Sequence, residues 1–426
     1  MQPDKFIVET YTLPCQHIRG YYRSTATSQE EELLLEVKKY VPKGNPEPRA
    51  GDVTIIAAHC AGMFKELYEP LFNQLISLSE SPSSKFRIRA IWIADLATHG
   101  ASAALNEGKL GVDLSWDDHA RDLLHMTNVF RQDMIRPIVG FGHSAGGTMI
   151  TRLAAMHPRL FASLLLIEPA ISKEYSPAMN YAPTYFMSYR KDVWPSLEDA
   201  FKETSKIGAQ RYWDAEVLHR WHDYGFRHLP TLQHPSKADG VTLATTKHHG
   251  ARAYARAVHP EPGKPLLSIE VNHRTHPDVS NEDIAKLKQP AYAPTAIAAF
   301  RDLPYLLPSA LFVYGEIVST AASRLDNREC MLPLVGSSMG GSGGMTANKV
   351  KEVVLDKSGH FVPFEKPQAV AEVCNEWLQQ QLPIWCEEER LNAQEWDRRG
   401  DARDKATLDQ EWMWWAKETY AKKSKI

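Results

Sequence analysis

A chain of 426 residues is long for one domain and short for three, so we expect one domain with a large insertion, or two domains. With 43% hydrophobic and 24% charged residues, the composition is that of a globular protein that can build a sizeable core. A formal net charge of −3 gives no indication of a nucleic-acid or anionic-membrane partner.

The cysteines and the N-terminal segment indicate the cellular compartment. Five cysteines are scattered along the chain without a Cys-x-x-Cys pair, which argues against a disulfide framework and a zinc site. The first residues include acidic side chains and a proline where a signal peptide needs a basic start and an apolar run. No apolar stretch approaches the roughly 20 residues that span a bilayer. We therefore expect a soluble, intracellular protein without a membrane span or a metal.

The elements predicted along the chain alternate between strands and helices. Segments 6–14 and 33–42 alternate well enough to form an antiparallel pair that leads the sheet. Apolar, β-branched runs predict strands at 52–60, 87–96, 136–143, 162–169, 309–316 and 351–360. Helical patterns occupy 65–78, 115–130, 145–157 and 367–382. This alternation predicts an α/β fold with a mostly parallel, doubly wound sheet.

Residues 170–307 differ from the segments on either side. They are rich in Tyr, Trp, His and Pro and have no strand rhythm, so they predict short helices joined by irregular loops. Because the strand pattern resumes at Ser309, we favour a helical cap inserted after the sixth strand over an independent second domain. The α/β core then comprises 1–169 and 308–385, and a charged helical tail with three tryptophans occupies 386–426.

Two serines lie in a Gly-x-Ser-x-Gly pattern, and their contexts differ. Ser144, in 142-GHSAG-146, comes directly after an apolar strand and directly before a helix. This is the arrangement of a nucleophile elbow, in which the serine hydroxyl is exposed at a helix N-terminus. Ser338, in 336-GSSMG-340, lies in a Gly- and Ser-rich loop without a convincing helix after it. We therefore predict Ser144 as the nucleophile.

A serine nucleophile requires a histidine base and a carboxylate that orients the base. Of seventeen histidines, His360 is the best candidate, because it ends the last predicted strand and follows a turn at Ser358-Gly359. His143 lies beside the nucleophile in the elbow, so its side chain should point elsewhere. His248 and His249 lie in the inserted region without a strand before them.

Two carboxylates compete for the role of the acid. The usual position, just beyond the strand at 310–316, holds Val318 and Ser319, which cannot orient an imidazole. Glu316 and Glu168 remain. Glu168 interrupts a strongly apolar strand end, and a buried carboxylate there needs a partner such as a histidine. We therefore favour Glu168 over Glu316.

The oxyanion hole requires backbone N–H groups from two places, the residue after the nucleophile and the loop after the third strand. Ala145 supplies the first. In the loop 59-HCAGMFKE-66, Gly62 permits a close turn, and we predict the N–H group of Met63 as the second donor.

Several of these segments together resemble a known family. The elbow, the terminal-strand histidine and the intervening cap look like an α/β-hydrolase over nearly the whole chain. More narrowly, 57-AAHCAGMFKELYEPL-71, the loop 340-GGSGG-344 and 359-GHFVPFEKP-367 resemble a family of fungal peroxisomal hydrolases. This family includes the acyl-CoA hydrolase of mycophenolic acid biosynthesis and relatives in toxin gene clusters. Its acid follows the sixth strand, as Glu168 does, although the acyl-CoA hydrolase carries Asp there.

The resemblance implies a function and a location. It implies a serine hydrolase that cleaves an acyl-CoA thioester or an ester, without a metal or an organic cofactor. A carboxylesterase, lipase or lactonase, an acyltransferase and a non-catalytic binding protein remain alternatives. The last residues, Ser424, Lys425 and Ile426, resemble a peroxisomal address that an import receptor would bind; without such import the protein would be cytoplasmic. The oligomeric state stays open, a homodimer included.

The aromatic residues of the inserted segment allow two interpretations. Tyr181, Tyr185, Phe186, Trp194, Trp213 and Trp221 would suit an apolar acyl chain. The same side chains could equally form the cap's own core, which is the more economical interpretation for any one of them.

Overall fold

The computed structural model describes residues 4–174, 177–257, 278, 291–318, 320 and 322–423. Two compact units make up the chain, Met1–Gln379 and Gln380–Ile426. The first unit holds all the residues that the sequence predicts to carry the chemistry, whereas the peroxisomal-type tripeptide 424–426 lies outside the described residues.

An eight-stranded sheet forms the centre of the first unit, in the order β1-β2-β4-β3-β5-β6-β12-β13. The strands are β1 (Phe6–Pro14), β2 (Leu34–Pro42), β3 (Val53–Ala58), β4 (Ile88–Ala94), β5 (Ile138–His143), β6 (Ser163–Ile167), β12 (Ser309–Gly315) and β13 (Val350–Leu355). β2 pairs antiparallel with both β1 and β4, and the other neighbours are parallel. The predicted mostly parallel sheet and its leading antiparallel pair are confirmed. The last strand ends at Leu355, so His360 lies in the loop beyond it.

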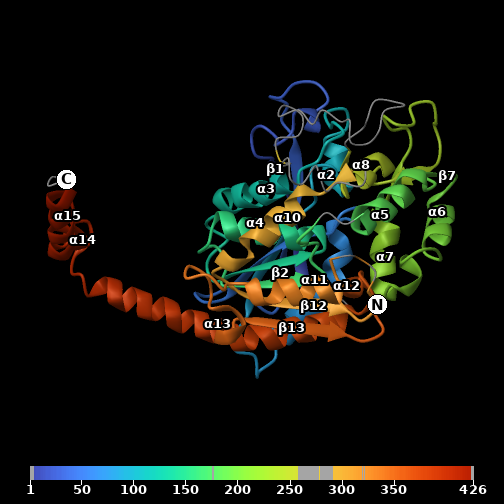
Figure 1. Cartoon of the computed structure of the whole chain (residues 1–426). Coiled ribbons are helices and arrows are strands. Elements are labelled where there is room, and N and C mark those ends of the chain that lie inside the picture. Colours follow the sequence, from blue (N-terminus) through green and yellow to red (C-terminus); the bar gives the residue numbers. More distant parts are fainter. Residues whose placement is uncertain are drawn as a thin grey trace. The chain divides into compact units, whose positions relative to one another are not determined.

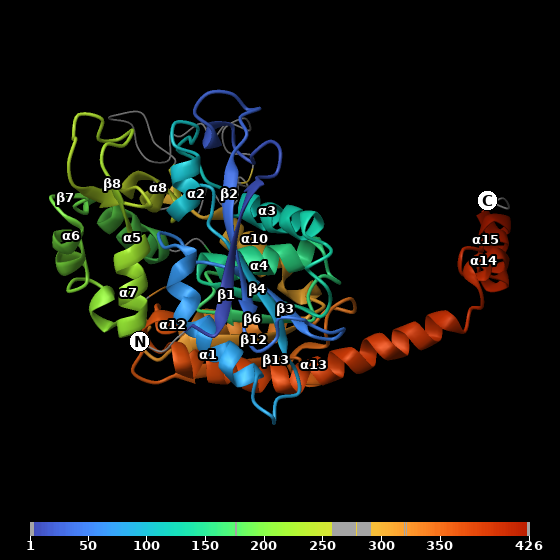
Figure 2. The ribbon, with the colours of Figure 1, turned by 180° about the vertical axis from the view of Figure 1, so that it is seen from behind.

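Helices cover both faces of this sheet, as its apolar strands require. Figure 1 shows α3, α4 and α10 together on one face, and Figure 2 shows α1 on the other, next to the start of α13. The helices of the core are α1 (Glu69–Ser79), α2 (Gly100–Leu105), α3 (Trp116–Val129), α4 (Ala145–Met156), α10 (Pro294–Asp302), α11 (Leu325–Met331), α12 (Val362–Glu365) and α13 (Pro367–Asp397). Every side chain of β3, β4, β5, β6 and β12 is buried.

The segment between β6 and β12 contains more strand than its sequence suggested. Its helices are α5 (Pro177–Tyr189), α6 (Leu197–Thr204), α7 (Ala215–Tyr224) and α8 (Lys247–Arg252), which Figure 1 shows gathered beside one end of the sheet. The expectation of no strands was wrong. β7 (Val193–Trp194), β9 (Val241–Leu243) and β8 (Phe226–His228) form a small antiparallel sheet, and β10 (Arg256–Ala257) pairs with β11 (Ala291–Tyr292). Strands of two or three residues are too short to produce an alternating pattern.

The aromatic residues of this segment divide between its core and the pocket described below. Trp194, Trp213 and Trp221 are buried, and the last two meet edge to face with ring centroids 5.8 Å apart. Tyr185 and Phe186 are exposed and line the pocket. The side chain of Tyr181 lies outside the described part of the structure. Each of the two sequence-based interpretations therefore holds for a different group of these residues.

The second unit is helical. α13 continues to Asp397, beyond the end predicted at 382, and α14 (Ala402–Lys405) and α15 (Gln410–Lys423) follow. Trp412, Trp414 and Trp415 are each more than half exposed within α15. Among the described residues, no helix is both long enough and apolar enough to cross a membrane.

Candidate active site

Ser144 lies in a strained turn between β5 and α4. Its backbone has φ 55° and ψ −118°, an unfavourable combination for a residue with a side chain. The turn places Ser144 directly before the first residue of α4, where the backbone N–H groups have no intrahelical acceptors. This is the strand–turn–helix context that the sequence predicts for a nucleophile elbow.

The two flanking glycines are required by the close approach of neighbouring backbone. A Cβ atom on Gly142 would lie 2.5 Å from the carbonyl oxygen of Gly146. A Cβ atom on Gly146 would lie 2.1 Å from the carbonyl oxygen of Ala58 in β3. Neither distance is compatible with any larger residue, so the Gly-x-Ser-x-Gly pattern reflects close packing within the elbow at Gly142 and against β3 at Gly146.

His360 lies between Ser144 and Glu168. Its Nε2 atom is 2.8 Å from Ser144 Oγ, and its Nδ1 atom is 3.1 Å from Glu168 Oε2. Glu168 is only 1% exposed, and its other oxygen accepts a hydrogen bond of 2.7 Å from the N–H group of Gly315. Glu168 also has a positive φ of 46°. The structure thus brings together the three predicted residues from the segments that follow three different strands, β5, β6 and β13.

The competing residues lie elsewhere. Glu316 accepts a hydrogen bond of 2.8 Å from the N–H group of Lys357 and is exposed. Ser338 lies in a loop fastened to the η5 segment (Leu303–Tyr305), where its N–H group donates to the Pro304 carbonyl. No described histidine contacts Ser338. The second Gly-x-Ser-x-Gly pattern is therefore a structural loop.

Hydrogen bonding within the loop after β3 decides which N–H group can meet an oxyanion. The N–H group of Cys60 donates to Tyr68 Oη, and that of Gly62 donates to His99 Nε2. The N–H group of Met63 turns back toward the Cys60 carbonyl, at 3.4 Å. Among the described residues, the N–H group of Ala61 has no acceptor. Ala61 and Met63 both line the pocket with Ser144 and Ala145, and these hydrogen bonds favour Ala61 as the donor over Met63, the residue predicted from the sequence.

A pocket of about 770 Å³ opens onto the serine and the histidine. Its walls come from the β3 loop, from α5 and from the loop after α6, and are mostly apolar. Tyr185, Phe186 and Ile207 line it and are more than half exposed. A pocket of this size and character suits an organic ligand with a substantial apolar part.

The family profile described as "Alpha/beta hydrolase family" matches residues 55–373, which is well over half of the chain. The chain belongs to the alpha/beta hydrolase family. The sequence-based assignment of this fold and family is confirmed.

Relatives of this hydrolase include fungal proteins. The Type I acyl-CoA thioesterase mpaH of Penicillium roqueforti (strain FM164) is 38% identical over 435 residues, covering 97% of this chain and 95% of the relative. The abhydrolase domain-containing protein AFT2-1 of Alternaria alternata is 26% identical, over 58% of this chain and 84% of its own. The solved structure of the peroxisomal alpha-beta-hydrolase Lpx1 from Saccharomyces cerevisiae matches with a TM-score of 0.67 at 17% identity, covering 89% of this chain and 90% of that chain.

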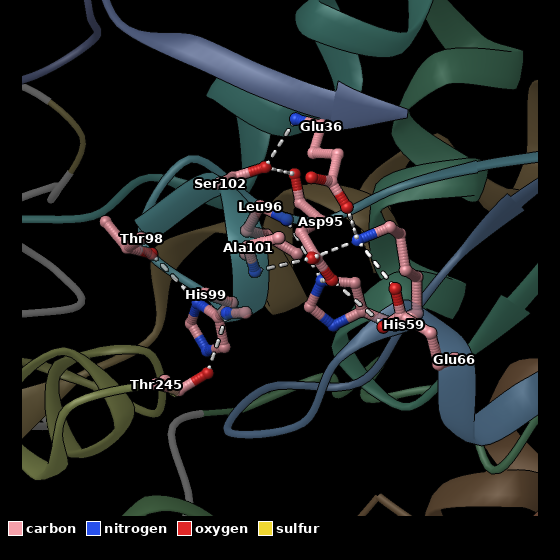
Figure 3. A network of polar contacts seen from close by, with 12 residues as sticks. Glu36, His59, Glu66, Asp95, Leu96, Thr98, His99, Ala101, Ser102 and Thr245 are labelled. Atoms are coloured by element: carbon pink, nitrogen blue, oxygen red, sulfur yellow. Dashed lines mark hydrogen bonds and ion pairs between the residues drawn. The ribbon is translucent and has the colours of Figure 1, made fainter. Parts of the chain in front are cut away.

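In this hydrolase, two buried histidines fix the shape of the β3 loop. His59 donates from Nδ1 to the Cys60 carbonyl and accepts from the Leu96 N–H group at Nε2. His99 accepts from Gly62 at Nε2, which leaves Nδ1–H to donate to Thr98 Oγ1. Burial lowers the pKa of His99 to about 3 and that of His59 well below its usual value, so both imidazoles stay neutral. Figure 3 shows both rings in this network.

A buried lysine lies beside the same loop. Lys65 is completely buried, and its ammonium group lies 2.6 Å from Asp95, 2.9 Å from Glu36 and 3.0 Å from Glu66. Asp95 also accepts from the N–H group of Lys65 and from that of Ala101, the second of which Figure 3 labels. Burial raises the pKa of the Asp95 carboxyl, and the neighbouring ammonium group opposes this shift. The cluster joins β2, β4 and the segment that follows the β3 loop.

His143, the residue before the nucleophile in the elbow, is a site residue whose role the sequence did not reveal. Its Nε2 atom lies 2.8 Å from the His360 carbonyl oxygen, which can only accept, so this nitrogen carries the proton. Its Nδ1 atom therefore accepts from Tyr68 Oη, at 2.8 Å. Tyr68 in turn accepts from the N–H group of Cys60. The fully buried imidazole of His143, together with Tyr68, thus connects the backbone of His360 to the β3 loop.

Proposed function

We propose that this hydrolase cleaves acyl thioesters through an acyl-enzyme formed on Ser144. The observation that carries the proposal is the continuous contact of Glu168, His360 and Ser144 at the edge of an apolar pocket. An imidazole that bridges a hydroxyl and a buried carboxylate can accept a proton at one nitrogen while the other nitrogen stays hydrogen-bonded.

The mechanism begins when His360 Nε2 accepts the Ser144 proton as Oγ attacks the acyl carbon. Glu168 stabilises the resulting imidazolium, and the N–H groups of Ala145 and Ala61 bind the oxyanion. Collapse of this intermediate breaks the carbon–sulfur bond, and the proton passes from His360 to the leaving thiolate. Water then attacks the acyl-enzyme with His360 as base, and the acid leaves as Ser144 regains its proton.

An acyl-CoA is the substrate class that we propose. The relative from Penicillium roqueforti, which is similar along 97% of this chain, is named as an acyl-CoA thioesterase, and the apolar pocket suits an acyl chain. The name of the Saccharomyces cerevisiae protein and the C-terminal Ser424-Lys425-Ile426 support a peroxisomal location. The alternative is an esterase or lactonase with the same acyl-enzyme.

A substrate panel tests this proposal directly. We expect the purified protein to release thiol from medium- and long-chain acyl-CoAs, measured with a thiol-reactive dye, at kcat/KM values above those for matched alkyl esters. Hydrolysis of esters and lactones without any thioester turnover would contradict the thioesterase assignment. Labelling by a fluorophosphonate without turnover of any substrate would leave an acyltransferase as the better hypothesis.

Glu168 and Glu316 can be separated as candidates for the acid. We expect Glu168→Gln to lower kcat by roughly 10²- to 10⁴-fold, since the amide cannot stabilise the imidazolium. The matched Glu316→Gln variant should stay within about twofold of wild type, because Glu316 is an exposed side chain that binds the Lys357 N–H group. Steady-state kinetics on one acyl-CoA measures both, and full activity in Glu168→Gln would refute the assignment.

A further inference from the structure

Arg190 is a cation in a mostly apolar pocket wall. It follows the last residue of α5 and lines the same pocket as Ser144 and His360. Its side chain is partly buried, and burial lowers the pKa of its guanidinium group. An arginine nevertheless stays protonated in proteins, so the pocket contains a full positive charge.

This charge lacks an ion-pair partner in the described part of the chain. The Nη1 atom of its guanidinium group lies 3.6 Å from Met187 Sδ, and a thioether is a weak acceptor. The nearby Asp192 pairs instead with Lys247, at 3.3 Å, and with His234, at 3.4 Å. A partly buried charge without a partner is costly, so an anion from outside the chain would stabilise it.

Arg190 lies close to the β3 loop. The terminal methyl group of Met187, its contact, is 3.5 Å from the position that a Cβ atom on Gly62 would take. Tyr254, another pocket residue, donates from Oη to the Ala61 carbonyl at 3.0 Å. One side chain thus separates the guanidinium from the loop that we assign to the oxyanion.

We propose that Arg190 binds an anionic group of the substrate, either a carboxylate on the acyl chain or a phosphate of coenzyme A. The proposal rests on the proposed function and extends it to the substrate's charge. The planar guanidinium fork matches both groups through paired hydrogen bonds. Its closeness to the β3 loop favours the acyl carboxylate, because the long pantetheine arm separates the thioester from the phosphates of coenzyme A.

Matched substrates and variants test this inference. The substrates are decanedioyl-CoA, its ω-methyl ester and the N-acetylcysteamine thioesters of both acyl groups. In Arg190→Gln, we expect the ratio of kcat/KM for the carboxylate over the methyl ester to fall by about 10- to 100-fold. In Arg190→Lys, which keeps the positive charge but not the planar guanidinium group, this ratio should fall by less. Arg211→Gln is the control, because Arg211 lies over the exposed Tyr212 ring, outside the pocket lining, and should keep the wild-type ratio.

The outcomes identify the source of the anion or refute the site. If Arg190→Gln lowers kcat/KM only for the substrates with an ω-carboxylate, whether the leaving group is coenzyme A or N-acetylcysteamine, the anion belongs to the acyl chain. If Arg190→Gln lowers kcat/KM for both CoA substrates but for neither N-acetylcysteamine thioester, the anion is a phosphate of coenzyme A. An equal effect on all substrates, or none, overturns the proposal.

A binding experiment keeps this inference separate from the proposed function. Calorimetric titration of Ser144→Ala with decanedioate should give a dissociation constant about 10-fold lower than titration of Ser144→Ala/Arg190→Gln. Equal affinity of the two variants for decanedioate, together with equal affinity for coenzyme A, would refute the anion site even if thioesters are hydrolysed. Weaker binding in the double variant, with no turnover of any thioester by wild type, would support the site and refute the thioesterase.

Discussion

Replacing Ser144 with alanine is expected to lower kcat for acyl-CoA hydrolysis by roughly 10⁴- to 10⁶-fold. The oxygen that attacks the acyl carbon is lost, whereas the N–H groups of Ala61 and Ala145 and the pocket remain. Labelling by a fluorophosphonate should disappear together with turnover, because the probe requires the same activated hydroxyl. Both are measured on purified protein whose circular dichroism matches that of wild type.

The chain contains its own control for this experiment. Ser338→Ala removes a serine from the second Gly-x-Ser-x-Gly pattern, whose loop makes backbone hydrogen bonds and no described histidine contact. It should keep both labelling and turnover. Residual labelling in folded Ser144→Ala, or a comparable loss in Ser338→Ala, would show that the elbow does not supply the nucleophile.

The second large effect is expected on stability, from Lys65→Met. Lys65 is completely buried among Glu36, Glu66 and Asp95. Methionine preserves much of the side-chain volume but removes the charge that compensates these carboxylates. Loss of one partner in a buried ionic cluster typically costs about 3–5 kcal/mol, a large share of the roughly 5–15 kcal/mol that stabilises a folded protein. Urea unfolding monitored by tryptophan fluorescence measures the change.

The pH dependence of this variant has a defined sign. Without the ammonium group, the pKa of Asp95 in the folded state should rise further above its unfolded value. A carboxyl with a raised folded-state pKa stabilises the fold while it is protonated, and this contribution is lost as the pH rises through that pKa. The deficit relative to wild type should therefore be larger at about pH 8 than at about pH 5.

Lys351→Met is the matched control for this substitution. Lys351 pairs with Glu376 at 3.1 Å, but both side chains are exposed, at 39% and 61%. A surface pair of this kind contributes little, so the loss should not exceed about 1 kcal/mol. Equal losses in the two lysine variants would contradict the argument from burial.

The sequence predicted the parts of the site that depend on a local sequence pattern or on the free-energy cost of burying a charge without a partner. Ser144 was identifiable because a strand, a Gly-rich turn and a helix adjoin it directly. Glu168 could be inferred because a carboxylate at the end of an apolar strand needs a partner, and His360 is in contact with it.

The rest depended on contacts between distant segments. The hydrogen bonds that favour Ala61 over Met63 as the donor could not be predicted, because His99, 37 positions from Gly62, and Tyr68 occupy neighbouring N–H groups of the loop. The strands between β6 and β12 pair across long sequence separations and are too short to leave a pattern. Lys65 carried no sequence signal of burial, since a lysine in a helical pattern normally faces solvent.

The bond between His143 and the His360 carbonyl has a consequence for how specificity can change. Through His143 and Tyr68, one continuous set of hydrogen bonds connects the elbow, the base and the loop beside the nucleophile. No residue of α5 takes part in these three hydrogen bonds, although Met187 of α5 lies close to Gly62 in the loop. We therefore expect that α5 can be remodelled to admit new acyl groups while the reacting atoms keep their spacing, so that substrate choice and chemical competence can diverge independently.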